Sequence, residues 1–177
     1  MRPVVAGLLA AMTAAAIATP VAAAPADQVA GLFMQSCLPY AGNPGRLRAW
    51  AAGNQLKTLT DPARATFLHG APGAVFDASN ATGKLVVVSS DDGICSVVTD
   101  LTSGQRVVDA LENDMRRSGI AFRMVIERDD SQVAALHDRE YLATRNGVGW
   151  RILAATVKDA PEGQAMLTAA PEVKAAE

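Results

Sequence analysis

Apolar residues in the first part of the chain recur at helical spacing. After Asp27 they follow the three-and-four spacing of one helical face, at Val29, Leu32, Phe33 and Cys37. This spacing predicts an amphipathic helix that Asp27 caps and Pro39 ends. A second helix is predicted from the cap Asn43, with Pro44 in its first turn, to Gly53.

The pattern changes from helical to alternating after Gly73. Three runs suited to strands span 74–77, 84–89 and 94–100, and turn-forming segments separate them. The runs predict an antiparallel meander. In the third run Cys95, Val97 and Thr99 share one face, so a disulfide from Cys37 to Cys95 would hold the first helix on that face of the sheet.

Helical spacing returns over 102–119. Thr102 and Gln105 have the separation of a capping box, and Gly119 is suited to closing the helix. Alternation over 122–127 then predicts a fourth strand. The segment therefore predicts a middle helix that leads into a further strand.

Asn146-Gly147 is typical of the two-residue hairpin turn in which both central residues have positive φ. If the turn is type I′, Arg145 pairs with Val148. The pairs further out are then Ala143 with Trp150, Leu142 with Arg151 and Tyr141 with Ile152. The face that carries Trp150 is expected to point into the core.

Together these elements predict one α+β domain over residues 27–160. We expect an antiparallel sheet of about five or six strands, covered by the N-terminal helices and the middle helix. After Lys158 the chain is rich in alanine, proline and glutamate, which predicts a disordered tail over 161–177.

The first 24 residues have the pattern of a cleaved export signal. Arg2 precedes an apolar stretch over 4–17, and Pro20 and small residues follow it. Cleavage is expected between Ala23 and Ala26. Pro20 and the small residues argue against an uncleaved membrane anchor, which needs about 20 consecutive apolar residues. We therefore expect a periplasmic or secreted protein with no stable membrane anchor.

Charge excludes a polybasic nucleic-acid binder. The chain has 16 basic and 18 acidic residues, and loss of Arg2 leaves 15 basic residues, for a net charge of −3. The two cysteines, Cys37 and Cys95, are expected to pair in an oxidising compartment, and two buried free thiols are the alternative. Closing this loop stabilises the fold by about 4 kcal/mol on the chain-entropy model.

Candidate chemistry is sparse. His69, in a glycine-containing loop, and Asp77 are the candidates for an acid–base pair, although no known catalytic motif surrounds them. His137 is expected at a solvated strand edge. The two histidines and two cysteines lack the short spacings of a zinc site, and the segment 89–93 is expected to form a hairpin turn rather than a calcium loop. No metal or cofactor is predicted.

The longest predicted loops, 68–73 and 129–137, are the places where a ligand groove is conceivable. Catalytic residues are not assigned there. The function favoured by these observations is a non-catalytic periplasmic or secreted protein that binds another protein or an envelope component. The alternative is a small envelope hydrolase that uses His69 with a nearby carboxylate such as Asp77.

Three short segments resemble a family of small uncharacterised exported proteins and lipoproteins of Gram-negative bacteria. They are Phe33-x-x-x-Cys37, Phe67-Leu68-His69-Gly70-x-x-Gly73 and Gly93-Ile94-Cys95-Ser96-Val97. The resemblance implies a periplasmic or secreted domain in which Cys37 and Cys95 are paired, and it brings no activity or catalytic residues. The chain lacks a lipidation cysteine and so departs from the lipoprotein members.

Overall fold

The computed structural model describes residues 23–100, 102–133, 135–158 and 163–172. Within these ranges the chain forms five helices and eight strands. The helices are α1 (Pro25–Gln35), α2 (Cys37–Tyr40), α3 (Pro44–Gly53), α4 (Ala63–Leu68) and α5 (Gly104–Arg117). The strands are β1 (Lys57–Thr58), β2 (Gly73–Asp77), β3 (Leu85–Ser90), β4 (Cys95–Thr99), β5 (Ala121–Asp129), β6 (Leu136–Arg145), β7 (Val148–Val157) and β8 (Ala165–Pro171).

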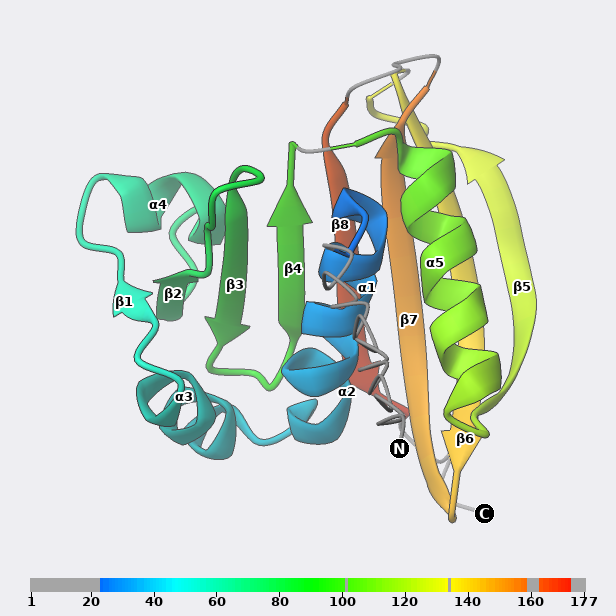
Figure 1. Cartoon of the computed structure of the whole chain (residues 1–177), viewed down its shortest axis with the longest axis horizontal. Helices are drawn as coiled ribbons and strands as arrows, with labels where there is room; N and C mark the ends of the chain where they lie inside the picture. Colours follow the sequence, from blue (N-terminus) through cyan, green and yellow to red (C-terminus); the bar gives the residue numbers. More distant parts are fainter. Residues whose placement is uncertain (1–22, 101, 134, 159–162, 173–177) are drawn as a thin grey trace, which may run out of the picture.

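All eight strands belong to one antiparallel sheet, in the order β1-β2-β3-β4-β8-β7-β6-β5 (Figure 1). The chain leaves β4 in the middle of the sheet, and α5 carries it across one face to β5 at the far edge. The strands β5 to β8 then return as a meander. The last strand, β8, closes the sheet by pairing with both β4 and β7.

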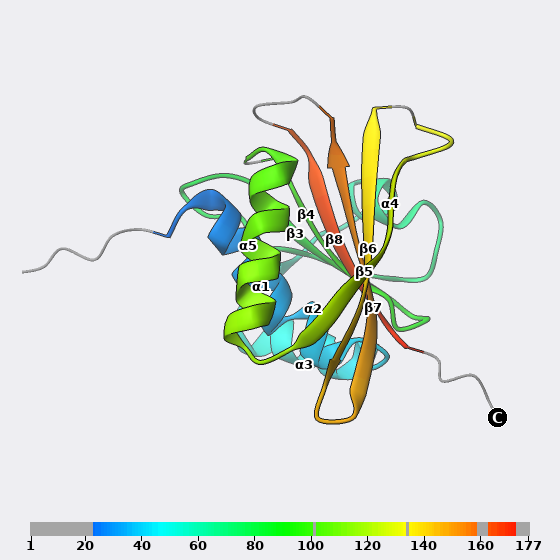
Figure 2. The same cartoon turned by 90° about the vertical axis from the view of Figure 1, so that its right-hand side faces the viewer.

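Helices cover the two faces unequally (Figure 2). On one face α1 packs against α5 and β4, α2 packs against β4 and β8, and α5 packs against β7. On the other face α4 lies over β2 and β3, where Leu68 contacts a small cluster with Val75 and Val88. The expected α+β class with an antiparallel sheet is thus confirmed.

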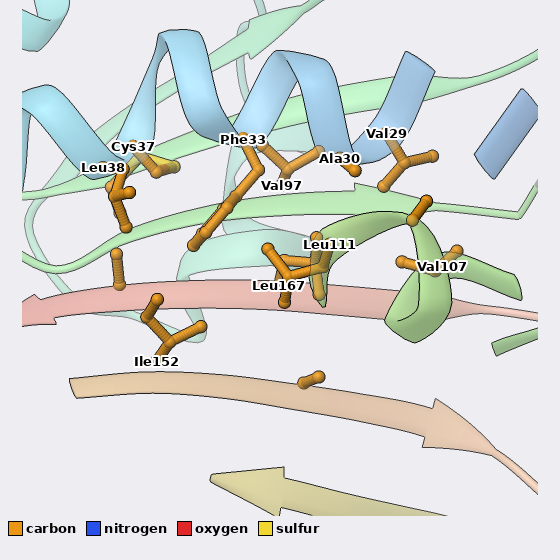
Figure 3. Close-up of a cluster of buried hydrophobic side chains, with 14 of the residues drawn as sticks. Val29, Ala30, Phe33, Cys37, Leu38, Val97, Val107, Leu111, Ile152 and Leu167 are labelled. Atoms are coloured by element: carbon orange, nitrogen blue, oxygen red, sulfur yellow. A yellow bond between two sulfur atoms is a disulfide. The ribbon is translucent and has the colours of Figure 1, made fainter. Parts of the chain in front are cut away.

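The main core lies between the sheet and the helices α1, α2 and α5 (Figure 3). Phe33 of α1, Leu111 of α5 and Leu167 of β8 are fully buried there. Beneath the helices, the strands carry small buried side chains, at Ala143, Ala154, Ala165 and Ala169. Small residues on the sheet leave room for the large side chains of the helices, so the two layers interdigitate.

The predicted disulfide between Cys37 and Cys95 is confirmed. Cys37 begins α2 directly after α1, Cys95 begins β4 on the helix-covered face, and their Cα atoms are 5.1 Å apart. Both residues are buried in the main core. The bond therefore ties the N-terminal helices to the middle of the sheet, as the alternation in β4 predicts.

The predicted number of strands is wrong, because the sheet has eight and not five or six. One extra strand is β1, which has only two residues and pairs with β2. So short a strand shows no alternation that a sequence pattern can reveal. The other is β8, in the segment 161–177 predicted as a disordered tail.

That tail prediction is wrong for Ala165–Pro171, which forms a central strand with Ala165, Leu167 and Ala169 buried. Alanine is uncommon in strands, so the composition of this segment does not favour a strand. The position that β8 takes in the sheet lies beneath the helices and needs small side chains. Residues 159–162 and 173–177, also within or beside the predicted tail, lie outside the described residues.

The predicted Asn146-Gly147 hairpin is confirmed in every pair. φ is +52° at Asn146 and +79° at Gly147. Arg145 pairs with Val148, and the register continues outward as predicted, through Ala143 with Trp150, Leu142 with Arg151 and Tyr141 with Ile152. The turn chemistry alone sets this register, because both central residues must adopt positive φ.

Helix ends agree only in part with the predicted caps. Asn43 caps α3 as predicted, and its Oδ1 accepts a hydrogen bond from Arg46 N at 3.1 Å. By contrast α1 begins at Pro25, so Asp27 lies in its first turn instead of capping it. The predicted capping box in α5 is also wrong, since its N-cap is Ser103 and Gln105 donates to Asp109 instead.

No helix among the described residues is both long enough and apolar enough to span a membrane. The predicted export signal, residues 1–24, lies outside the described residues except for Ala23 and Ala24.

Candidate functional site

A groove of about 430 Å³ lies on the helix-covered face, at the end of the sheet where the β6–β7 hairpin turns. Its walls come from α1, α2, the C-terminal end of α5 and the hairpin, which lie toward the lower edge of Figure 1. Segments far apart in the sequence thus form one hollow. Two smaller hollows, of about 360 and 220 Å³, lie beside His137 and beside Phe67.

The floor of the groove is apolar. Met34 of α1, Leu38 of α2, Ile120 after α5 and Trp150 of β7 line it. Leu38, Ile120 and Trp150 are also part of the main core, with exposed fractions of 4%, 5% and 8%. The groove is therefore an opening to the edge of the core, an arrangement typical of sites for apolar ligands.

Trp150 is held in the groove by the hairpin. The register places it opposite Ala143 and Pro171, on the helix-covered face of β7. The residue is 8% exposed and belongs to the lining of the groove. An indole combines a large apolar ring with one hydrogen-bond donor, so Trp150 can offer a ligand in the groove both kinds of contact.

Arg145 is the uncompensated charge at the groove. It lies on the same face of the hairpin as Trp150, and no ion pair is found for it among the described residues. The other charged residue of the lining, Asp114, forms an ion pair with Arg117. Arg116 and Arg117 also stand in the last turn of α5, where positive charge offsets the helix dipole.

The structure does not bring the candidate pair His69 and Asp77 together. His69 follows α4 with φ of +48°, and its side chain is exposed. Asp77 is the last residue of β2, whereas His69 lies before the first residue of this strand. The length of β2 therefore separates the two residues. Hydrogen bonds from Ser79 lower the pKa of the Asp77 carboxyl.

His137 lies in a network of charges between β5 and β6. Its Nδ1 is 3.1 Å from Asp129 Oδ1 and its Nε2 is 3.4 Å from Glu127 Oε1. Arg139 Nε donates to Glu127 at 2.8 Å, and Lys158 Nζ lies 3.0 Å from Asp129. Hydrogen bonds from Arg139 and His137 lower the pKa of Glu127, and those from His137 and Lys158 lower the pKa of Asp129.

The opposite charges of this network offset one another across the pairing of β5 with β6. Among the described residues no group of three or more histidine, cysteine or acidic side chains is arranged to hold a metal ion. The segment 89–93 contains the end of β3 and the hairpin turn that leads to β4, as predicted.

Sequence patterns did not indicate the groove. The two predicted places for one, 68–73 and 129–137, adjoin the smaller hollows and not the groove itself. The signal that was available is the hairpin register, which places Arg145 and Trp150 on one face near the turn. The contributions of α1, α2 and α5 depend on how the helices lie on the sheet.

Comparisons with protein-family models, with curated proteins and with solved structures found no match to this chain.

Proposed function

We propose that this chain is an exported, non-catalytic binding protein and that the groove between α1, α2, α5 and the hairpin is its binding site. The observation that carries the proposal is the groove itself, whose apolar floor opens to the edge of the core and whose lining includes Arg145, for which no ion pair is found among the described residues. A groove with an apolar floor and a few unpaired polar groups is the usual form of a ligand site.

Export is supported by the N-terminal pattern and by the Cys37–Cys95 disulfide, which persists in an oxidising compartment such as the periplasm. We also propose that the chain belongs to the family of small exported proteins that it resembles. The partner is another protein or an envelope component.

The alternative of a hydrolase that uses His69 and Asp77 has less support. A general acid or base must lie within hydrogen-bond reach of its partner group. The length of β2 separates these two residues, and Asp77 is held by Ser79. No observation on the described residues favours this alternative over binding.

Gly31 offers a way to test the proposal without disturbing the core. It lines the groove, and a Cβ added there meets only Gln35 Nε2, at 4.0 Å. Gly31→Trp therefore fills the groove with a side chain from an otherwise intact α1. Gly53→Trp is the matched control, because a Cβ at this end of α3 has open space around it and lies away from the groove.

The experiment is a capture from envelope extract with the mature protein, followed by quantitative mass spectrometry. We expect a specific partner to be retained by the wild type and by Gly53→Trp, and lost from Gly31→Trp. Retention of the same partner by all three proteins would place the binding site elsewhere. A hydrolytic activity lost in His69→Ala would replace the proposal with the alternative.

A further inference from the structure

Resting on the proposed function, we propose that the groove binds an amphipathic carboxylate, a ligand with one apolar chain and one anionic head. The apolar chain lies on the floor of the groove and the head is held by Arg145 and Trp150. The proposal rests on the shape of the groove, the nature of its lining and the balance of charges around it.

The floor favours an apolar chain. Met34, Leu38 and Ile120 line the groove without contributing a polar side-chain group. Met34 is only partly buried, and its flexible side chain can adapt to a bound chain. Covering these residues removes apolar surface from water, which supplies the main driving force for binding.

Two hydrogen-bond donors that lie close together determine which head group the ligand carries. Arg145 pairs with Val148, and Trp150 is two residues further along β7 on the same face, so their side chains are diagonal neighbours in the hairpin. A guanidinium and an indole N–H are both donors without acceptor capacity. A carboxylate, which when ionised only accepts hydrogen bonds, complements both.

The surrounding charges favour an anion over a cation. Asp114 is neutralised by Arg117, and the C-terminal end of α5 carries two arginines. The backbone there is also satisfied, because Gly119 N–H donates to Arg116 O and Ile120 N–H donates to Met115 O. Arg145 then supplies the positive charge that an anionic ligand complements.

Dodecanoate is the probe for this proposal, used below its micelle concentration in isothermal titration calorimetry with the mature protein. Two further probes separate the contributions of head and chain. Dodecyltrimethylammonium has the same chain with a cationic head, and acetate has the carboxylate without the chain. We expect one site for dodecanoate, and no measurable binding of the other two.

Variants of the two donors test their roles. Arg145→Gln is expected to weaken dodecanoate binding about tenfold or more, because a charge-assisted hydrogen bond is lost. Trp150→Phe keeps the ring and removes the donor, and is expected to weaken binding about threefold to tenfold. Arg106→Gln, an exposed arginine near the other end of α5, is the control and is expected to change nothing.

Fluorescence gives an independent measurement. The chain has two tryptophans, Trp50 and Trp150. In a Trp50→Phe background, dodecanoate is expected to change the emission of Trp150, and Gly31→Phe in the same background is expected to abolish the change. A variant that unfolds is recognised by its emission and by circular dichroism before any titration.

The proposed ligand class would be overturned by equal binding of dodecyltrimethylammonium, by unchanged affinity in Arg145→Gln, or by absence of dodecanoate binding to folded protein. That result alone would not overturn the proposed function. If envelope capture still depends on Gly31 while dodecanoate does not bind, the groove remains the site, and a peptide or another partner is its occupant. If capture does not depend on Gly31 either, both proposals fail.

Discussion

Gly104 shows how a single residue limits the fit of α5 on the sheet. It begins α5 and lies against Thr156 of β7, and a Cβ at this position would overlap the Thr156 side chain. Thr156 is itself held in place, since its Oγ1 donates to His137 O at 3.2 Å. A side chain at residue 104 therefore has to push the start of α5 away from the sheet.

We predict that Gly104→Ala lowers the free energy of unfolding by about 1 to 3 kcal/mol, the usual cost of overpacking. Urea denaturation measures the change. Gly53→Ala is the control, because its Cβ meets open space at a helical position, where alanine is preferred over glycine. Equal stability of the two variants would mean that α5 does not lie this close to β7.

Asp138 is an acidic residue whose surroundings disfavour its charge. It is 7% exposed and lies in β6. Burial raises the pKa of its carboxyl, and the negative charge of Asp130 raises it further. Hydrogen bonds from the backbone of Val133 and Gln132 keep the pKa of Asp130 low. Ionising Asp138 in the folded state is therefore less favourable than ionising it in the unfolded chain.

This difference gives stability a definite dependence on pH. A carboxyl with a raised pKa in the folded state makes the fold less stable as pH rises above the value of the unfolded chain, about 4. We predict that Asp138→Asn gains stability relative to the wild type as pH is raised from 4 toward 7. Urea denaturation at several pH values measures the difference, and a difference that stays constant with pH would contradict the prediction.

At the scale of elements, β8 holds the two halves of the sheet together. It pairs with β4 on one side and β7 on the other, and Leu167 at its centre is fully buried beneath the helices. The neighbouring Met166 lies on the opposite face of the same strand and is only partly buried. The strand is thus a structural part of the domain and not an extension of it.

We predict that Leu167→Ala lowers the free energy of unfolding by about 2 to 5 kcal/mol, as expected for a large side chain removed from a core. Met166→Ala changes the same strand on its other face and is expected to cost clearly less. Both are measured by urea denaturation. Similar effects of the two changes, or none, would show that β8 does not pack as described.

The sequence predicts elements well where local chemistry decides them. Asn146-Gly147 sets the hairpin, and the Asn43-Pro44 pair sets the start of α3. It does not predict elements that form only because neighbouring strands of the sheet pair with them. The alanines of β8 have low strand propensity, and they form a strand because β4 and β7 offer it two edges and the helices above require small side chains.

At the scale of the whole molecule, helices cover the two faces of the sheet unequally. Helices α1, α2 and α5 share one face, and the Cys37–Cys95 bond holds the first part of that layer to β4. The groove arises at the hairpin end, where this layer stops short of the turn between β6 and β7. Neither cysteine takes part in it.

The sequence predicts the strand pairing of two groove residues but not the groove. The hairpin register places Arg145 and Trp150 on one face, but their surroundings depend on α5 crossing from β4 to the far edge of the sheet. Gly31 and Met34 in α1 come next to them through that crossing and through the disulfide. Hydrophobic periodicity records which residues are buried, but it does not record which helices end side by side.

The central claim is that the groove is the binding site, and the indole N–H signals in a ¹⁵N–¹H spectrum of the mature protein test it most directly. The two tryptophans give one signal each, and Trp50 lies outside the groove lining. When the partner recovered by envelope capture is added, we predict that the Trp150 signal shifts and the Trp50 signal stays in place. A bound partner that leaves the Trp150 signal unchanged would contradict the account.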